Sequence, residues 1–292
     1  MALSPEAGQA PMPAAREAWT PAAREARPLT LLGCFAHPDD ETWSVGASFA
    51  LLVPKGVRCA VWTATRGQAG EIADGSGATR ENLAEVREAE ERAAMAVVGV
   101  TDVELGDFVD GQVADADQGD LVGSVQRAFQ RVRPDVVVTM EPGGVTSHPD
   151  HVAVSAAVQA AFGAYRQPPG AREPRLYYWG VPASQLARFR ELAAERGVEI
   201  PGEDDPFGPR GTPDEQFTCW VDTSPVAEQV WRTLQEHRTQ AGDPSRGLLR
   251  DGELWREVFA TTAFVRVHPA PRADDPPETS LVDSFTAGAA DG

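Results

Sequence analysis

The chain has 292 residues, of which 42% are hydrophobic and 24% charged, a composition typical of a globular protein with a sizeable core. Its formal net charge is −18, which argues against DNA or RNA as a partner because binding to phosphates requires a basic surface. No apolar run approaches the length of a membrane-spanning helix, about 18 residues, so we expect no membrane span.

Both ends of the chain have the composition of segments outside a folded core. Residues 1–28 are rich in Ala, Pro, Arg and Glu, contain the short repeat PAAREAWT and PAAREARP, and show no apolar stretch of a secretory signal. Residues 269–292 hold Pro, Asp, Ala and Gly with few large apolar residues. We predict a flexible N-terminal extension and a flexible C-terminal tail.

Between the ends, apolar segments typical of strands alternate with segments typical of helices. This alternation predicts a Rossmann-like, three-layer α/β fold with a mostly parallel sheet and helices on both faces. Many Pro and Gly residues in 184–215 predict long loops there. The predicted strands are 29–36, 57–64, 102–106, 134–140, 175–180, 216–222 and 262–267, and the predicted helices are 42–53, 79–98, 118–132, 149–165, 224–239 and 251–259.

The three cysteines lie in apolar contexts without CxxC spacing. This pattern indicates reduced, packed thiols, and we therefore expect a cytoplasmic protein.

Two tetrapeptides share the pattern His-Pro-Asp-x, namely HPDD at 37–40 and HPDH at 148–151. Each follows a predicted strand and opens a predicted helix, where proline suits the first turn. Because ligands bind beyond the carboxyl ends of the strands in such sheets, we expect both tetrapeptides at the same rim. Three of the five histidines fall in them, which core packing does not explain. The alternative is that His37 and Asp39 only cap a helix.

Three consecutive carboxylates, Asp39 to Glu41, follow the first strand and repel one another unless a positive charge is close. His37 and Asp40 can approach one metal ion from a single turn, and His151 can complete the ligand set. Two imidazoles and one carboxylate leave a position open for water, as in catalytic zinc sites. Asp39 then remains available as a base, and Glu41 as a partner that orients the ligands.

The sequence AHPDDE with a later HPDH resembles the LmbE-like (PIG-L) N-deacetylases, zinc enzymes that remove acetyl groups from N-acetylglucosamine-containing molecules. The resemblance implies a deacetylase domain over residues 29–268. Weaker similarities lie in TRGQAGE (65–71), LAEVREAEERAAMAVVGV (83–100), FVDG (108–111) and HRTQ (237–240).

The resemblance implies that His37, Asp40 and His151 are the zinc ligands, with Fe²⁺ as the other metal to consider. It also implies that Asp39 is the general base and that His148 assists the oxyanion and the leaving group. The expected reaction is removal of an acetyl or other acyl group from the amide nitrogen of an N-acetylglucosamine-type sugar by metal-activated water. Bound zinc lowers the pKa of water to about 7 and polarises the carbonyl, which suits this reaction.

Asp150 lies two residues from His148 and is placed to hold that imidazole in its protonated state. A protonated His148 would stabilise the developing oxyanion and supply a proton to nitrogen. The alternative is that Asp150 only complements the dipole of the helix that begins there.

Candidates for substrate binding are Arg66, Glu41, Thr146 and His237. Arg66 follows the second strand on the same rim, and the alternative is a surface salt bridge. His237 sits in the family-like HRTQ context, and the alternative is a packed histidine on a helix. Thr146 precedes HPDH at a place where many relatives carry glycine or an aromatic residue.

Glu90 falls on the apolar stripe of the helix at 79–98. A buried carboxylate requires a partner, and Arg87, three residues back, is the one that we predict.

Two other functions use similar features. A non-catalytic binding or regulatory module could keep the same fold, and non-haem iron oxygenases also use two histidines and one carboxylate, usually as His-x-Asp on β-jelly rolls. The chain lacks the GxGxxG and GxSxG patterns of dinucleotide-binding proteins and serine hydrolases. We expect a small-molecule sugar amide as the substrate; which sugar, and whether the chain forms a homo-oligomer, stay open.

Overall fold

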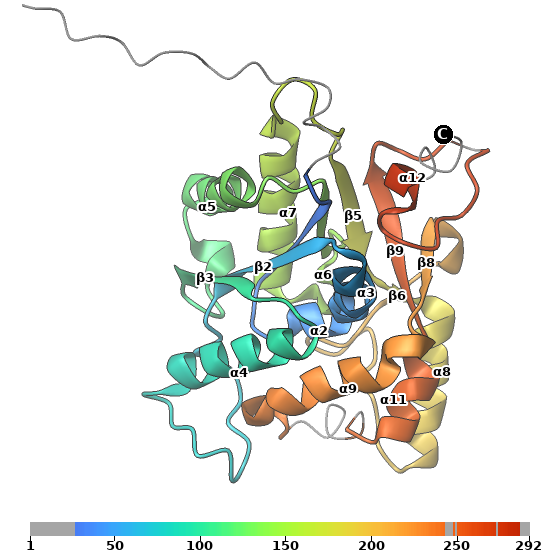
Figure 1. Ribbon diagram of the computed structural model, residues 1–292. Coiled ribbons are helices and arrows are strands. Elements are labelled where there is room, and N and C mark those ends of the chain that lie inside the picture. Colours follow the sequence, from blue (N-terminus) through green and yellow to red (C-terminus); the bar gives the residue numbers. More distant parts are fainter. Residues whose placement is uncertain (1–26, 243–247, 249, 273, 287–292) are drawn as a thin grey trace, which may run out of the picture.

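A computed structural model describes residues 27–242, 248, 250–272 and 274–286, so the predicted N-terminal extension lies almost entirely outside the described residues. Its centre is a seven-stranded sheet with the order β3-β2-β1-β4-β5-β9-β8 (Figure 1). The first five strands in this order pair in parallel, and β9 and β8 pair antiparallel. The strands are β1 (Thr30–Phe35), β2 (Arg58–Thr65), β3 (Asp102–Phe108), β4 (Val136–Met140), β5 (Arg175–Trp179), β8 (Cys219–Asp222) and β9 (Thr261–His268), with a separate pair β6 (Val181–Pro182) and β7 (Gly211–Thr212).

Helices cover both faces of the sheet. Successive side chains of a strand point to opposite faces, so Leu31 joins the core under α3, α4, α9 and α11, whereas Leu32 joins the core under α5 and α7. The predicted three-layer α/β fold is therefore confirmed. The helices are α2 (Asp40–Ser44), α3 (Gly46–Leu52), α4 (Leu83–Val97), α5 (Gln118–Val132), α6 (Gly144–Ser147), α7 (Pro149–Ala164), α8 (Ala183–Glu195), α9 (Ala227–Glu236), α11 (Gly252–Val258) and α12 (Asp283–Thr286).

The prediction of long loops over 184–215 is wrong in its first part, where α8 lies. Leu186, Leu192 and Ala193 of this helix are buried. The run of Ala, Leu, Arg and Glu favours a helix, and the Pro and Gly residues that suggested loops lie after it. Among the described residues, no helix is both long and apolar enough to span a bilayer.

Part of the segment predicted as a C-terminal tail, 269–292, packs against the sheet beside β8 and β9 (Figure 1). The carboxylate of Glu278 lies 2.9 Å from the Arg266 guanidinium, and its backbone carbonyl accepts a hydrogen bond from the amide of Trp220. Leu281 is fully buried. Ion pairs of Glu278 and Asp275 and the buried side chains of Leu281 and Val282 thus hold a segment whose overall composition suggested a tail.

The strand order changes direction between β1 and β4, because the chain proceeds from β1 outward through β2 to β3 and then returns to β4 on the other side of β1. Such a switch point leaves a crevice beyond the carboxyl ends of the two strands. HPDD follows β1 and HPDH follows β4, separated from it by the α6 loop. The prediction that both tetrapeptides share one rim is confirmed.

Candidate active site

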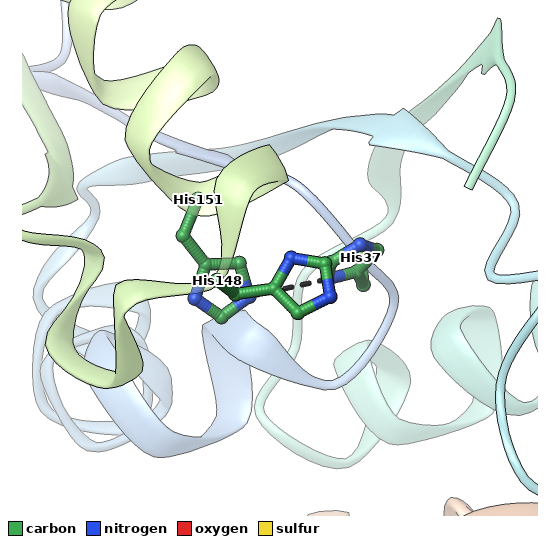
Figure 2. Close-up of side chains that lie close together, drawn as sticks. All are labelled: His37, His148 and His151. Atoms are coloured by element: carbon green, nitrogen blue, oxygen red, sulfur yellow. Dashed lines mark hydrogen bonds between the residues drawn. The ribbon is translucent and has the colours of Figure 1, made fainter. Parts of the chain in front are cut away.

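Three imidazoles from the two tetrapeptides meet at this crevice (Figure 2). His37 belongs to the loop between β1 and α2, His148 caps the N-terminus of α7, and His151 lies in the first turn of α7. One ring nitrogen of each lies within 4.8 Å of those of the other two. The dashed line in Figure 2 joins His37 Nδ1 and His151 Nε2, which are 3.2 Å apart.

Hydrogen bonds fix which ring nitrogens face each other. His37 Nε2 lies 3.0 Å from a carboxylate oxygen of Asp110 and 3.1 Å from one of Asp150, so this nitrogen carries the proton and donates. His151 Nδ1 lies 3.0 Å from the carbonyl oxygen of Gly144 and donates to it. The remaining nitrogens, His37 Nδ1 and His151 Nε2, then face each other with lone pairs, an arrangement that requires a cation or a proton between them.

Asp40 completes the donor set. Its Oδ2 lies 3.8 Å from His37 Nδ1, and its Oδ1 lies 3.5 Å from His151 Nε2. The backbone amides of Ala36 and His37 donate to Oδ2 at 3.2 and 2.9 Å and hold the carboxylate in place. Atoms that each lie about 2.0–2.2 Å from one zinc ion are no more than about 4.4 Å apart, and the Asp40 carboxylate meets this limit toward His37 with one oxygen and toward His151 with the other.

The carboxylates around His37 stabilise positive charge. Burial disfavours a charged imidazole, but the hydrogen bonds to Asp110 and Asp150 and the negative charges of Asp40 and Asp110 together outweigh it and raise the pKa of His37 to about 10. For Asp110, burial alone would raise the pKa, because it disfavours the charged carboxylate. The hydrogen bond from His37 acts against burial, and the pKa of Asp110 falls to about 2. The site therefore has the charge balance of a cation-binding centre.

Asp110 is a site residue that the prediction did not include. It follows β3 within FVDG, and the amide of Ala69 donates to its second carboxylate oxygen at 2.8 Å. The sequence position of Asp110 could have identified it as a site residue, because a carboxylate just past the carboxyl end of a parallel strand lies on the same rim as His37.

Asp150 does not hold the imidazole of His148, so this prediction is wrong. Its carboxylate accepts hydrogen bonds from the amides of Gly111 at 2.7 Å and Val113 at 3.0 Å and contacts His37. These amides belong to the loop after β3, which lies against the first turn of α7. The spacing of residues along the chain does not indicate this contact.

His148 also differs from its predicted protonated state. The amide of Asp150 donates to its Nδ1 at 3.2 Å, so Nε2 carries the proton of the neutral ring. Burial and the neighbouring imidazoles of His37 and His151 lower the pKa of His148 and favour this neutral form. The centroid of the ring also lies 4.8 Å from that of Phe207, a residue that belongs to no sequence motif identified above.

Asp39 has a left-handed backbone, with φ 104°, which costs a residue other than glycine about 1–3 kcal/mol and is common at functional sites. Its amide lies 3.1 Å from Glu41 Oε2 and 3.3 Å from Glu91 Oε2. Its carboxylate lies 3.5 Å from the guanidinium of Arg87. Neighbouring side chains thus fix both the backbone and the carboxylate of Asp39.

Arg87 does not pair with Glu90, contrary to the prediction. Its guanidinium donates to the carbonyl oxygens of Pro38 and Gly67, the latter at 3.0 Å. Glu90 instead accepts hydrogen bonds from the amide and hydroxyl of Thr239 at 2.9 and 2.6 Å. Arg87 therefore ties the HPDD loop to the loop after β2.

We expect Arg87→Met to lower the free energy of unfolding by about 3–5 kcal/mol, because it leaves buried oxygens without their cationic partner. Arg92→Met on the same helix is the control. Arg92 is half exposed, pairs with Glu88 at 2.9 Å and donates to the carbonyl of Val103 at 2.9 Å, and the loss of both contacts is expected to cost about 1–2 kcal/mol. Urea unfolding measures both, and equal losses would contradict the role of Arg87.

The candidates for substrate binding lie in different surroundings. Thr146 lines a cavity beside Asp40 and His151. Arg66 is 42% exposed and pairs with acidic side chains of the surface. Glu41 and His237 are buried, with His237 Nε2 3.5 Å from Glu41 Oε1. Of these four residues, the structure brings Thr146 alone to the cavity.

The position of His151 requires a glycine at residue 144. Gly144 has φ +68°, and a Cβ atom there would lie 2.8 Å from the Cβ atom of His151. We expect Gly144→Ala to displace His151 and to weaken metal binding about 10- to 100-fold, the usual cost of losing an orienting partner. Gly143→Ala is the control, because its φ is −74° and the nearest neighbouring atom would be 3.9 Å away. Metal titration compares the two, and equal affinities would contradict this role.

Comparison with known proteins agrees with this geometry. Residues 32–162 match the family model described as PIG-L: GlcNAc-PI de-N-acetylase. Among curated relatives, a 1D-myo-inositol 2-acetamido-2-deoxy-alpha-D-glucopyranoside deacetylase of Kineococcus radiotolerans is 32% identical over 252 residues, covering 73% of this chain and 69% of the relative. The deacetylase of the same name from Geodermatophilus obscurus is 32% identical over 268 residues, covering 80% and 90%.

Solved structures show the same fold at lower identity. N,N'-diacetylchitobiose deacetylase from Pyrococcus horikoshii has a TM-score of 0.56 and 17% identity, covering 88% of this chain and 92% of its own. The 4-carboxy-2-hydroxymuconate hydratase GalB from Pseudomonas putida has a TM-score of 0.57 and 18% identity, covering 85% and 99%. The fold thus carries more than one chemistry, and the curated relatives decide the family. The chain belongs to the PIG-L (LmbE-like) de-N-acetylase family, as its two His-Pro-Asp tetrapeptides suggested.

Proposed function

We propose that this chain is a metal-dependent amide hydrolase that removes an acetyl or other acyl group from the nitrogen of an N-acetylglucosamine-type sugar or glycoside. The observation that carries the proposal is the pair of facing nitrogens, His37 Nδ1 and His151 Nε2, 3.2 Å apart with the Asp40 carboxylate beside them. Relatives at 32% identity are named as deacetylases of such a sugar.

Two imidazoles and one carboxylate suit Zn²⁺, and Fe²⁺ accepts the same donors. The bound metal would supply polarisation of the amide carbonyl and activation of water. Asp110 and Asp150 would hold the ring of His37 with Nδ1 directed at the ion, and the carbonyl of Gly144 would do the same for His151 Nε2.

Asp39 and His148 have separate roles in the proposed reaction. Asp39 accepts the proton of the attacking water, and Arg87 keeps its carboxylate in position. His148 donates a hydrogen bond from Nε2–H to the carbonyl oxygen as negative charge develops there, an effect worth about 3–4 kcal/mol. The proton held by Asp39 then passes to the amide nitrogen, the C–N bond breaks, and a carboxylate and a free amino sugar leave.

The test is hydrolysis of an N-acetylglucosaminyl-inositol and of methyl N-acetylglucosaminide, with acetate and free amine both measured. We expect equal amounts of the two products, loss of activity on chelation, and recovery with Zn²⁺ or Fe²⁺. If the metal-loaded protein hydrolyses none of these amides and only binds them, the competing function, a non-catalytic binding module on this fold, is correct instead.

The cysteines bear on the compartment. Cys34, Cys59 and Cys219 are buried free thiols. They support our proposal that the protein works in the reducing cytoplasm.

A further inference from the structure

A cavity of about 210 Å³ opens against two of the metal-binding residues, Asp40 and His151. It lies where the carboxyl ends of β4 and β5 meet α2, α8 and α11. Its walls are mostly apolar and largely aromatic. They include Trp43, Met140, Trp179, Leu186, Phe189 and Phe259.

The cavity offers few partners for hydroxyl groups. Besides Asp40 and His151, its polar lining residues are Thr146 and Gln185. The amide nitrogen of Gln185 already donates to the backbone carbonyls of Val258 at 2.5 Å and Thr261 at 3.0 Å. A sugar ring in this space would lose its water without regaining hydrogen bonds, whereas each buried methylene of a hydrocarbon improves binding about fourfold.

The two sides of the metal centre therefore differ. Asp40 and His151 face the apolar cavity, whereas His37 and His148 are absent from its lining, and His37 instead contacts Asp110 among the polar groups of the rim. In the hydrolysis proposed above, the amide carbonyl would be held beside Asp40 and His151. Its carbon is bonded to the acyl chain on one side and to the sugar nitrogen on the other, and the apolar lining of the cavity suits the acyl chain.

Size points the same way. The acyl part of an N-acetyl group beyond its carbonyl is one methyl, while the cavity has a volume of about 210 Å³. An apolar space of this size, left to a single methyl, would remain largely unfilled.

We propose, on the basis of the function proposed above, that this cavity binds the hydrocarbon chain of the acyl group. The substrate is then an amino sugar whose nitrogen carries a medium-length or phenyl-bearing acyl group, and its hydroxyls lie toward the polar rim.

The test uses methyl glucosaminides that differ only in the N-acyl group: acetyl, butyryl, hexanoyl and octanoyl. We expect kcat/KM for amine release to rise about two- to fourfold per methylene until the cavity is full and then to fall. A second series keeps N-acetyl and lengthens an alkyl aglycone, and here we expect no comparable rise.

Variants of the wall test the assignment directly. Val181→Phe narrows the cavity and is expected to lower the hexanoyl-to-acetyl ratio of kcat/KM at least fivefold, whereas Phe189→Ala enlarges it and is expected to move the optimum to a longer chain. Glu191→Ala, at an exposed position on the same helix as Phe189, should leave the ratio unchanged.

Three other outcomes of the two substrate series would contradict the assignment of the cavity to the acyl chain. Hydrolysis of N-acetyl amides with no gain from longer acyl groups overturns this inference and leaves the proposed function intact. A rise only in the aglycone series assigns the cavity to the aglycone and also overturns it. Absence of hydrolysis in both series, with metal bound, overturns the proposed function as well.

Discussion

His151→Ala is expected to lose bound Zn²⁺ and, with it, amide hydrolysis. The substitution removes one of the two facing nitrogens and leaves the Asp40 carboxylate with one imidazole. For Asp110→Asn, which removes only a partner that orients His37, we expect metal affinity to fall about 10- to 100-fold. The fall in metal affinity for His151→Ala should be larger. Metal content after dialysis, together with titration by isothermal calorimetry, measures both effects.

His268→Ala serves as the control for this series. His268 is 49% exposed at the end of β9, and its side chain contacts Glu173 and the ring of Phe162, outside the candidate site, so metal content should not change. Full metal occupancy of the His151→Ala variant would show that the ion binds elsewhere, and the proposed mechanism would then be wrong.

Asp39→Asn should keep the metal and lose amide hydrolysis by about 10²- to 10⁴-fold, because an amide cannot accept the proton of the attacking water. Asparagine is the informative replacement, since it tolerates the left-handed backbone of this position, where alanine would add strain. The assay is kcat at saturating substrate, combined with metal analysis of the same preparation.

Asp115→Asn, at an exposed position outside the site, is the matched control and should retain full activity. If Asp39→Asn also stays within a few-fold of the unaltered protein, Asp39 is not the base. Loss of metal from that variant would instead indicate that Asp39 belongs to the ligand set.

The residues that we propose as metal ligands could be placed together from the sequence because their signals are local. Each tetrapeptide carries its histidines and carboxylates within four residues, and alternation of strands and helices is enough to bring the ends of β1 and β4 to one rim. The fold class and most element positions follow from the same short-range patterns. Neither inference depends on knowing which side chains touch across the molecule.

What could not be predicted depends on such contacts. Asp150 turns to His37 because the loop after β3 presents backbone amides to it, and Glu90 finds Thr239, 149 positions away along the chain. Arg87 reaches backbone carbonyls instead of the nearest carboxylate on its own helix. A buried polar group takes whichever partner the tertiary structure offers, so proximity in sequence is a weak guide to its pairing.

The cavity wall extends beyond the stretch that carries the two tetrapeptides. Both tetrapeptides lie within 32–162, the stretch that matches the family model, whereas α8 and α11, which supply part of the cavity wall, lie beyond it. Substrate preference can consequently diverge during evolution while the hydrolytic chemistry is inherited unchanged. Grafting residues 181–215 from a relative is a direct way to exchange one specificity for another.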